Sequence, residues 1–171
     1  MADVADTPLP SRLWKQLSPK QKLEAADAFW RDENAAAEQA ELLATIAQRI
    51  KFRIKSVVAM PVEQRARQLV SLPAVSEAVA ARLLVVYHMA HQRPMMGQFL
   101  DAVGIAHDDG MVSNEEIEAP APERLAVAAA TLAAAFPVDE VSLYLLTLIW
   151  QDPDTWGGLA GLPEVSTAPS P

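Results

Sequence analysis

The sequence predicts an all-α fold, a single-domain bundle of about seven helices, and three observations carry this prediction. Its 171 residues are the length of one ordinary domain. Hydrophobic residues make up 51% of the chain but aromatic residues only 6%, and much of the difference is alanine, the best helix former. The stretches from Ala74 to Gln92 and from Val141 to Trp150 are apolar almost all round. We therefore expect these two helices to pair at the centre of the bundle.

The domain is expected to cover residues 11–159, because the two ends of the chain lack any apolar period. Residues 1–10 and 160–171 are rich in Pro, Ser, Thr and Ala, a composition typical of disordered tails.

The first helices carry clear start signals. Residues 11–17 can form one short helix that places Trp14 on the core. Ser18 then precedes Pro19, which suits a first helical position, and Gln21 stands where a capping box requires Glu or Gln. These residues predict a helix from Pro19 to about residue 32.

A long second helix is predicted over residues 35–58, with Asn34 as its cap. Its apolar residues recur with a period of 3.6, and Ile46, Ile50 and Ile54 share one side. Residues 49–55 also alternate strictly between basic and apolar, as a strand would. We prefer the helix because the helical period extends upstream and no second strand offers a partner.

The basic end of this helix is the candidate interaction surface. Phe52 is predicted to point away from the apolar side, among four basic residues. Two interpretations stay open: a solvated face on which another segment covers Phe52, or a contact surface for a partner helix, an anionic membrane or nucleic acid. Nucleic acid is disfavoured because a chain with pI of about 4.8 lacks the basic stripe that phosphate binding requires. The predicted partner-binding residues are Arg49, Lys51, Phe52, Arg53 and Lys55.

The remaining helices are bounded by Pro and Gly. Helices are expected over residues 61–72 and 95–103, the latter stopped by Gly104, and the alanine-rich segment 122–136 forms another. Arg82 lies inside the central helix, where an unpaired charge would be costly. We expect its partner to be one of the C-terminal acids.

Charge is divided unevenly along the chain. Residues 1–70 contain 11 Lys and Arg against 9 Asp and Glu, whereas residues 71–171 contain 3 against 13. Either the basic helices neutralise the acidic half, or the protein has a dipolar surface that steers a charged partner.

The histidines offer an alternative function. His88 and His91 are one helical turn apart, and His107 lies beside Asp108 and Asp109. Imidazole and carboxylate ligands suit a divalent transition metal such as Zn, Mn or Fe, which could activate a water in a metal-dependent enzyme. The competing interpretation is structural: two histidines at a helix end, and a turn at residues 108–110. The absence of cysteine excludes disulfides and thiolate chemistry.

No known catalytic signature occurs, because the chain lacks a phosphate-binding loop, a dinucleotide turn, a GxSxG elbow and an HExxH pair. We therefore assign no catalytic residue and expect no cofactor. The predicted function is a non-enzymatic protein-interaction or scaffold domain that self-associates. Two apolar helices, four tryptophans and an outward Phe52 together present more apolar surface than one small domain can bury. Neither a signal sequence nor a transmembrane segment is expected, which predicts a cytoplasmic, acidic homo-oligomer.

Overall fold

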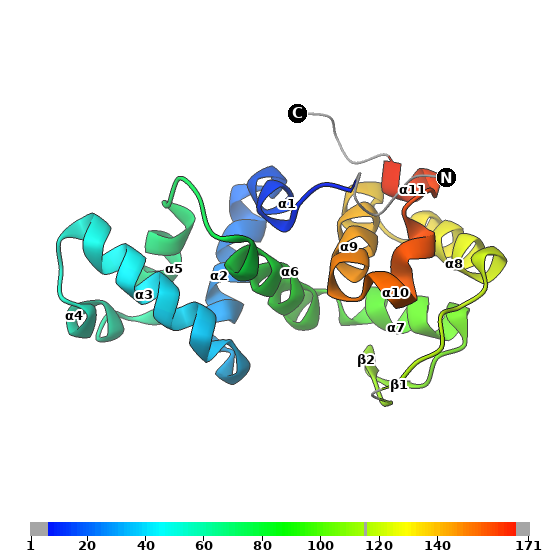
Figure 1. Ribbon diagram of the computed structural model, residues 1–171, viewed down its shortest axis with the longest axis horizontal. Coiled ribbons are helices and arrows are strands. Elements are labelled where there is room, and N and C mark those ends of the chain that lie inside the picture. Colours follow the sequence, from blue (N-terminus) through cyan, green and yellow to red (C-terminus); the bar gives the residue numbers. More distant parts are fainter. Residues whose placement is uncertain (1–6, 115, 167–171) are drawn as a thin grey trace. The chain divides into compact units, whose positions relative to one another are not determined.

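The structure is a computed structural model that describes residues 7–114 and 116–166, and it is helical apart from one short hairpin (Figure 1). The predicted all-α class is confirmed. The described part of the chain contains eleven α-helices, several of them a single turn, rather than about seven. None of the helices in these ranges combines the length and the apolar character needed to cross a membrane.

The chain divides into two compact units, which we describe separately. The N-terminal unit is Leu9–Ala90, and the C-terminal unit begins at His91 and includes the segment before Leu9. The predicted helices 74–92 and 141–150 therefore belong mainly to different units. Their pairing, and the single domain over residues 11–159, stay predictions.

Six helices and one 3-10 turn build the N-terminal unit. Its first long helix begins as predicted, with a capping box in which the Gln21 N–H donates to the Ser18 hydroxyl at 3.1 Å and the Ser18 N–H donates to the Gln21 side chain at 2.8 Å. The elements are α1 (Pro10–Gln16), α2 (Pro19–Arg31), η2 (Glu33–Ala35), α3 (Ala36–Ile50), α4 (Ile54–Val58), α5 (Val62–Val70) and α6 (Glu77–His91).

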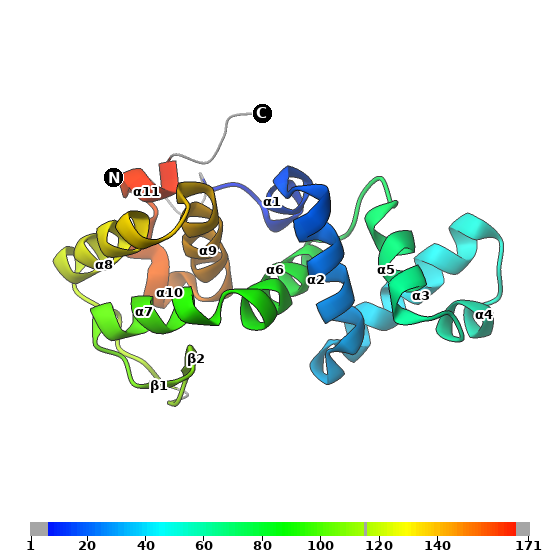
Figure 2. The same ribbon diagram turned by 180° about the vertical axis from the view of Figure 1, so that it is seen from behind.

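The core of this unit lies where α2 packs against α5, which is visible from both sides in Figures 1 and 2. Phe29 is completely buried, and its ring meets Trp30 edge-on at 5.2 Å between centroids. The Arg65 guanidinium on α5 lies over the Trp30 ring, 5.1 Å from its centroid. Aromatic packing thus holds the end of α2 against α5.

Two predictions for this unit are wrong. The helix predicted over residues 35–58 is interrupted after Ile50, because Lys51 adopts a left-handed conformation with φ of 59°. Asn34 is not its cap: Asn34 lies within the 3-10 turn, and its N–H donates to the Asp32 side chain at 3.0 Å.

Arg82 also differs from the prediction in its partner. Its Nε lies 3.6 Å from Glu38 Oε1 on α3, within the same unit, and not beside a C-terminal acid. Both side chains are partly buried, so the pair neutralises Arg82, the one arginine or lysine of α6.

The C-terminal unit is organised around α9, in which every residue from position 141 to position 149 is buried. This helix packs against α8, α10 and α11, while α7 packs against α8. Phe99, Tyr144 and Trp156 form an aromatic cluster, with centroid distances from Phe99 of 5.7 and 5.6 Å. The elements are α7 (Arg93–Val103), β1 (His107–Asp108), β2 (Met111–Val112), α8 (Pro122–Ala135), α9 (Val138–Gln151), α10 (Pro153–Trp156), η3 (Gly157–Leu159) and α11 (Pro163–Ser166).

The predicted tails need correction at their inner ends. The Pro8 carbonyl accepts a hydrogen bond from Trp150 Nε1 at 2.6 Å, and α1 already begins at Pro10. At the other end, Ala160 and Val165 are buried around the short helix α11. Residues 1–6 and 167–171 of the predicted tails lie outside the described residues.

Candidate functional site

The predicted interaction residues lie at the joint between α3 and α4, and all five are exposed. Phe52 is 54% exposed, so no described segment covers it. The tryptophans behave differently: Trp14, Trp30 and Trp156 are buried, and Trp150 is partly buried. Of the aromatic residues invoked for self-association, only Phe52 therefore offers a largely exposed side chain.

Local backbone chemistry explains why Phe52 points outward. Lys51 takes the left-handed conformation that ends a helix, and the N–H groups of Lys51 and Phe52 both donate to the Ala47 carbonyl, the latter at 2.9 Å. The Phe52 bond is the 6→1 bond of a Schellman motif and the Lys51 bond is the 5→1 bond of an αL motif, two helix endings that are usually built on glycine. Arg53 is then extended and precedes α4. The chain therefore turns sharply at residues 51–53 and exposes their side chains.

Helix α4 extends this exposed surface. Its five residues bury only Val57, while Ile54 and Val58, one helical turn apart, are each 51% exposed. The sequence predicts Ile54 on the core side of a continuous helix, but the helix breaks at Lys51, and α4 starts in a new orientation that turns Ile54 outward. We define the basic–apolar patch as Lys51, Phe52, Arg53, Ile54, Lys55 and Val58.

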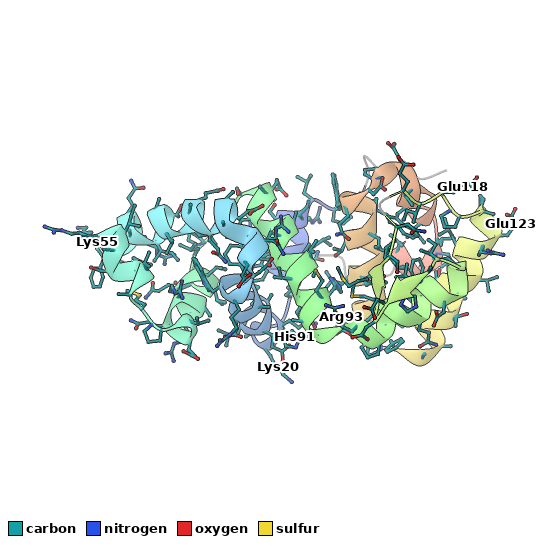
Figure 3. All side chains as sticks on the ribbon, turned by 90° about the horizontal axis from the view of Figure 1, so that it is seen from below. Lys20, Lys55, His91, Arg93, Glu118 and Glu123 are labelled. Carbon is teal, nitrogen blue, oxygen red and sulfur yellow. The ribbon has the colours of Figure 1, made fainter. Side chains whose placement is uncertain are left out.

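The charges of the basic–apolar patch have no acidic counterpart nearby in sequence, because residues 42–62 contain neither Asp nor Glu. Lys51, Arg53 and Lys55 make no ion pair with any described residue. Figure 3 shows the Lys55 side chain extended away from the ribbon. Arg49 differs, since its guanidinium donates to the Ser71 carbonyl at 2.7 Å and so helps to hold the N-terminal unit together.

This site combines exposed apolar side chains with cations that have no ion pair within the described ranges. An isolated exposed hydrophobic residue is ordinary, but three within residues 52–58, with basic residues between them, are typical of a protein-interaction surface. Sequence reasoning identified Phe52 and its basic neighbours and missed Ile54 and Val58. The left-handed residue that decides their direction is a lysine, which gives no recognisable turn signal.

The histidines of the alternative metal site have separate structural roles. His88 is buried in α6, where its Nδ1 lies 2.7 Å from the Leu84 carbonyl, and burial lowers its pKa to about 4. His91, at the end of the same helix, is exposed.

His107 supports the hairpin of the C-terminal unit. Its Nδ1 accepts the Gly110 N–H at 3.0 Å, which leaves Nε2 as the protonated nitrogen that donates to Asp101 Oδ1 at 2.8 Å. The neighbouring Asp108 and Asp109 are exposed. Within the described ranges, no three His, Asp or Glu side chains gather closely enough to hold one metal ion. The geometry therefore gives the metal alternative no support.

An open pocket of about 710 Å³ lies between the C-terminal end of α7 and the segment leading into α8. Its ionisable lining residues are Arg124, Glu116 and Glu118, all exposed. The Arg124 guanidinium donates a hydrogen bond to the Val103 carbonyl at 3.3 Å, at the C-terminal end of α7. The mixture of charges in an open, solvated pocket indicates no particular ligand.

No family model, no curated protein and no solved structure matches this chain. Any inference about its function therefore rests on its own sequence and structure.

Proposed function

We propose that this protein is a non-enzymatic interaction domain that self-associates through the basic–apolar patch. The observation that carries the proposal is the joint exposure of Phe52, Ile54 and Val58 among three cations that form no ion pair with any described acid. Aromatic residues and arginine are enriched in the cores of protein interfaces, and here Phe52 and Arg53 supply both.

A protein partner suits the charge of the whole molecule better than an anionic polymer. The chain carries a net charge of −8, so a nucleic acid or an anionic membrane would be repelled by most of it. A second copy brings the acids that the basic–apolar patch lacks, because residues 71–171 carry 13 of the 22 Asp and Glu.

The expected strength of the contact is moderate. Burying the exposed half of each apolar side chain contributes about 1 kcal/mol, so the three together contribute roughly 3 kcal/mol. That gain only partly offsets the loss of translational and rotational freedom on association. The charges must therefore add to affinity and orientation, and association should weaken as salt is raised.

Sedimentation velocity of the full chain over a range of concentrations tests this proposal. The test variant combines Phe52→Glu with Lys55→Glu, and the matched control combines Lys15→Glu with Gln16→Glu on the exposed face of α1. Both variants change the charge by −3. We expect the wild type and the control to associate alike and the test variant to dissociate at least tenfold more readily.

Two results would contradict the proposal. A wild type that stays monomeric at every concentration would exclude self-association. A test variant that associates as strongly as the control would place the contact elsewhere on the chain. Binding of the wild type to anionic vesicles, with no self-association, would favour a membrane surface instead.

A further inference from the structure

We infer that the basic–apolar patch of one copy binds the acidic hairpin face of a second copy, which we define as Asp108, Asp109, Met111 and Val112. This inference rests on the proposed self-association and names the surface that receives the patch. It makes the contact heterologous, joining the N-terminal unit of one copy to the C-terminal unit of the next.

The two surfaces match in composition and are opposite in charge. Met111 and Val112 are 38% and 37% exposed, and the two aspartates beside them are also exposed. Residues 101–112 contain three Asp and no Lys or Arg. The basic–apolar patch has the reverse pattern, with three cations around three apolar side chains and no acid in residues 42–62. Contact between them would bury apolar area and pair charges together.

One cation, Arg93, lies beside the acidic hairpin face and offsets only part of its negative charge. Arg93 Nη1 donates to the backbone carbonyl of Asp109 at 3.1 Å, which places one positive charge beside the turn. Asp101, 76% exposed at its side chain, lies on the other side of His107 and adds a third carboxylate. The surroundings of the hairpin thus remain net negative.

Both surfaces are held in place before binding. Gly110 lies so close to α7 that an added Cβ would stand 2.8 Å from Met96 Cβ, and His107 bonds the turn to Asp101. The α3–α4 joint is closed by the two hydrogen bonds to Ala47. Side chains that start from rigid backbones lose less entropy on binding, so modest contact areas can suffice.

The alternative contact, patch against patch, is disfavoured by charge. A symmetric contact would bring two groups of three cations together, and like charges facing each other oppose association. A heterologous contact leaves one patch and one hairpin face unused at the ends of each pair, so it continues into a closed ring or an open chain of copies.

Mixing two assembly-deficient variants tests the inference. The patch variant is Phe52→Glu with Lys55→Glu. The hairpin variant is Asp108→Lys with Asp109→Asn, in which asparagine retains tolerance for the left-handed φ of 49° at this position. Each variant alone should be monomeric. An equimolar mixture should form a dimer of twice 18.5 kDa that grows no further, because it contains one intact patch facing one intact hairpin face.

A control for the hairpin variant changes the charge by the same +3 at another acidic site. Glu118→Lys with Glu123→Gln serves, since both residues are exposed and Figure 3 shows them in the C-terminal unit. This control should associate like the wild type. Hydrogen exchange of the hairpin amides in the hairpin variant checks that the hairpin itself is still folded.

The outcomes separate this inference from the proposed function. If the wild type and the folded hairpin variant associate equally while the patch variant does not, self-association stands and the hairpin assignment is overturned. If both variants are monomeric but their mixture stays monomeric, the heterologous contact is also overturned. A monomeric wild type would mean that the proposed function has failed first.

Discussion

The basic–apolar patch and the acidic hairpin face each lie at a turn in which a residue other than glycine is left-handed, yet the two turns are supported differently. Lys51 and Asp109 have φ of 59° and 49°. The turn at Lys51 depends on local backbone bonds and leaves its side chains exposed. The hairpin turn instead presses Gly110 against α7. The patch should therefore tolerate substitution, whereas the hairpin should tolerate it only at outward residues.

The largest expected effect is at the buried side of the hairpin. Gly110→Ala should lower the free energy of unfolding by about 3 kcal/mol, because φ of 85° is strained for alanine and its Cβ would clash with Met96 and the Arg93 carbonyl. Urea denaturation measures this loss. Gly104→Ala is the control: its φ is 78°, but its Cβ meets only the flexible end of Arg124, so about 1–2 kcal/mol should be lost. Equal losses would show that packing against α7 contributes nothing.

The next effect concerns the side chain that bonds the hairpin turn to α7. His107→Phe should cost about 2 kcal/mol, because the buried Gly110 N–H would lose its acceptor. Hydrogen exchange should show faster exchange of that amide. Asp101→Asn retains an oxygen acceptor for His107 Nε2 and should cost less than about 0.5 kcal/mol at this exposed position. If Asp101→Asn costs as much as His107→Phe, the carboxylate, rather than the bond to Gly110, holds the turn.

At the basic–apolar patch, one substitution is expected to raise the free energy of unfolding by a smaller amount. Lys51→Gly should stabilise the protein by about 0.5 kcal/mol, since relief of left-handed strain exceeds the extra entropy of glycine in the unfolded chain. The thermal midpoint measures the gain. Asp109→Gly should gain less, because aspartate tolerates the left-handed region better than lysine. Destabilisation by Lys51→Gly would mean that the Lys51 side chain supports the joint.

The smallest expected effect on stability is at Phe52. Phe52→Ser should change the free energy of unfolding by less than about 0.5 kcal/mol, because the side chain is mostly exposed. The same substitution should still weaken self-association several-fold in sedimentation. A large loss of stability would identify Phe52 as a folding residue and remove the distinction between patch and hairpin.

Prediction from sequence succeeded where local chemistry decides the structure. The start of α2 follows from the capping box at Ser18 and Gln21, and the end of α7 follows from Gly104, which is left-handed with φ of 78°. The turn predicted at residues 108–110 is present, with Asp109 and Gly110 left-handed and Asp108 already paired with Met111 in the hairpin. The sequence gives no sign of the two short strands. In each case the residues that form the hydrogen bonds or the turn are neighbours in the chain.

Prediction failed where a residue adopts a backbone conformation that is rare for its type, or where its partner lies far away in the chain. Lysine rarely ends a helix in the left-handed conformation, so the break at Lys51 was invisible, and the direction of Ile54 and Val58 was lost with it. The sequence predicts a C-terminal acid as the partner of Arg82, yet the partner is Glu38 on α3. Charge alone indicates that a partner is needed and does not indicate which one.

The sequence by itself determined the all-α class, the capped helix ends and the basic cluster around Phe52, because helical period, caps and composition act over a few neighbouring residues. Only the tertiary structure decided which apolar side chains stay exposed, which carboxylate pairs with Arg82 and how closely Gly110 approaches α7. The partner of Arg82 and the approach of Gly110 depend on contacts between residues that are apart in the chain, whose free energies are settled only when the whole unit packs. The exposure of Ile54 and Val58 depends on the left-handed conformation of Lys51, which lysine does not signal.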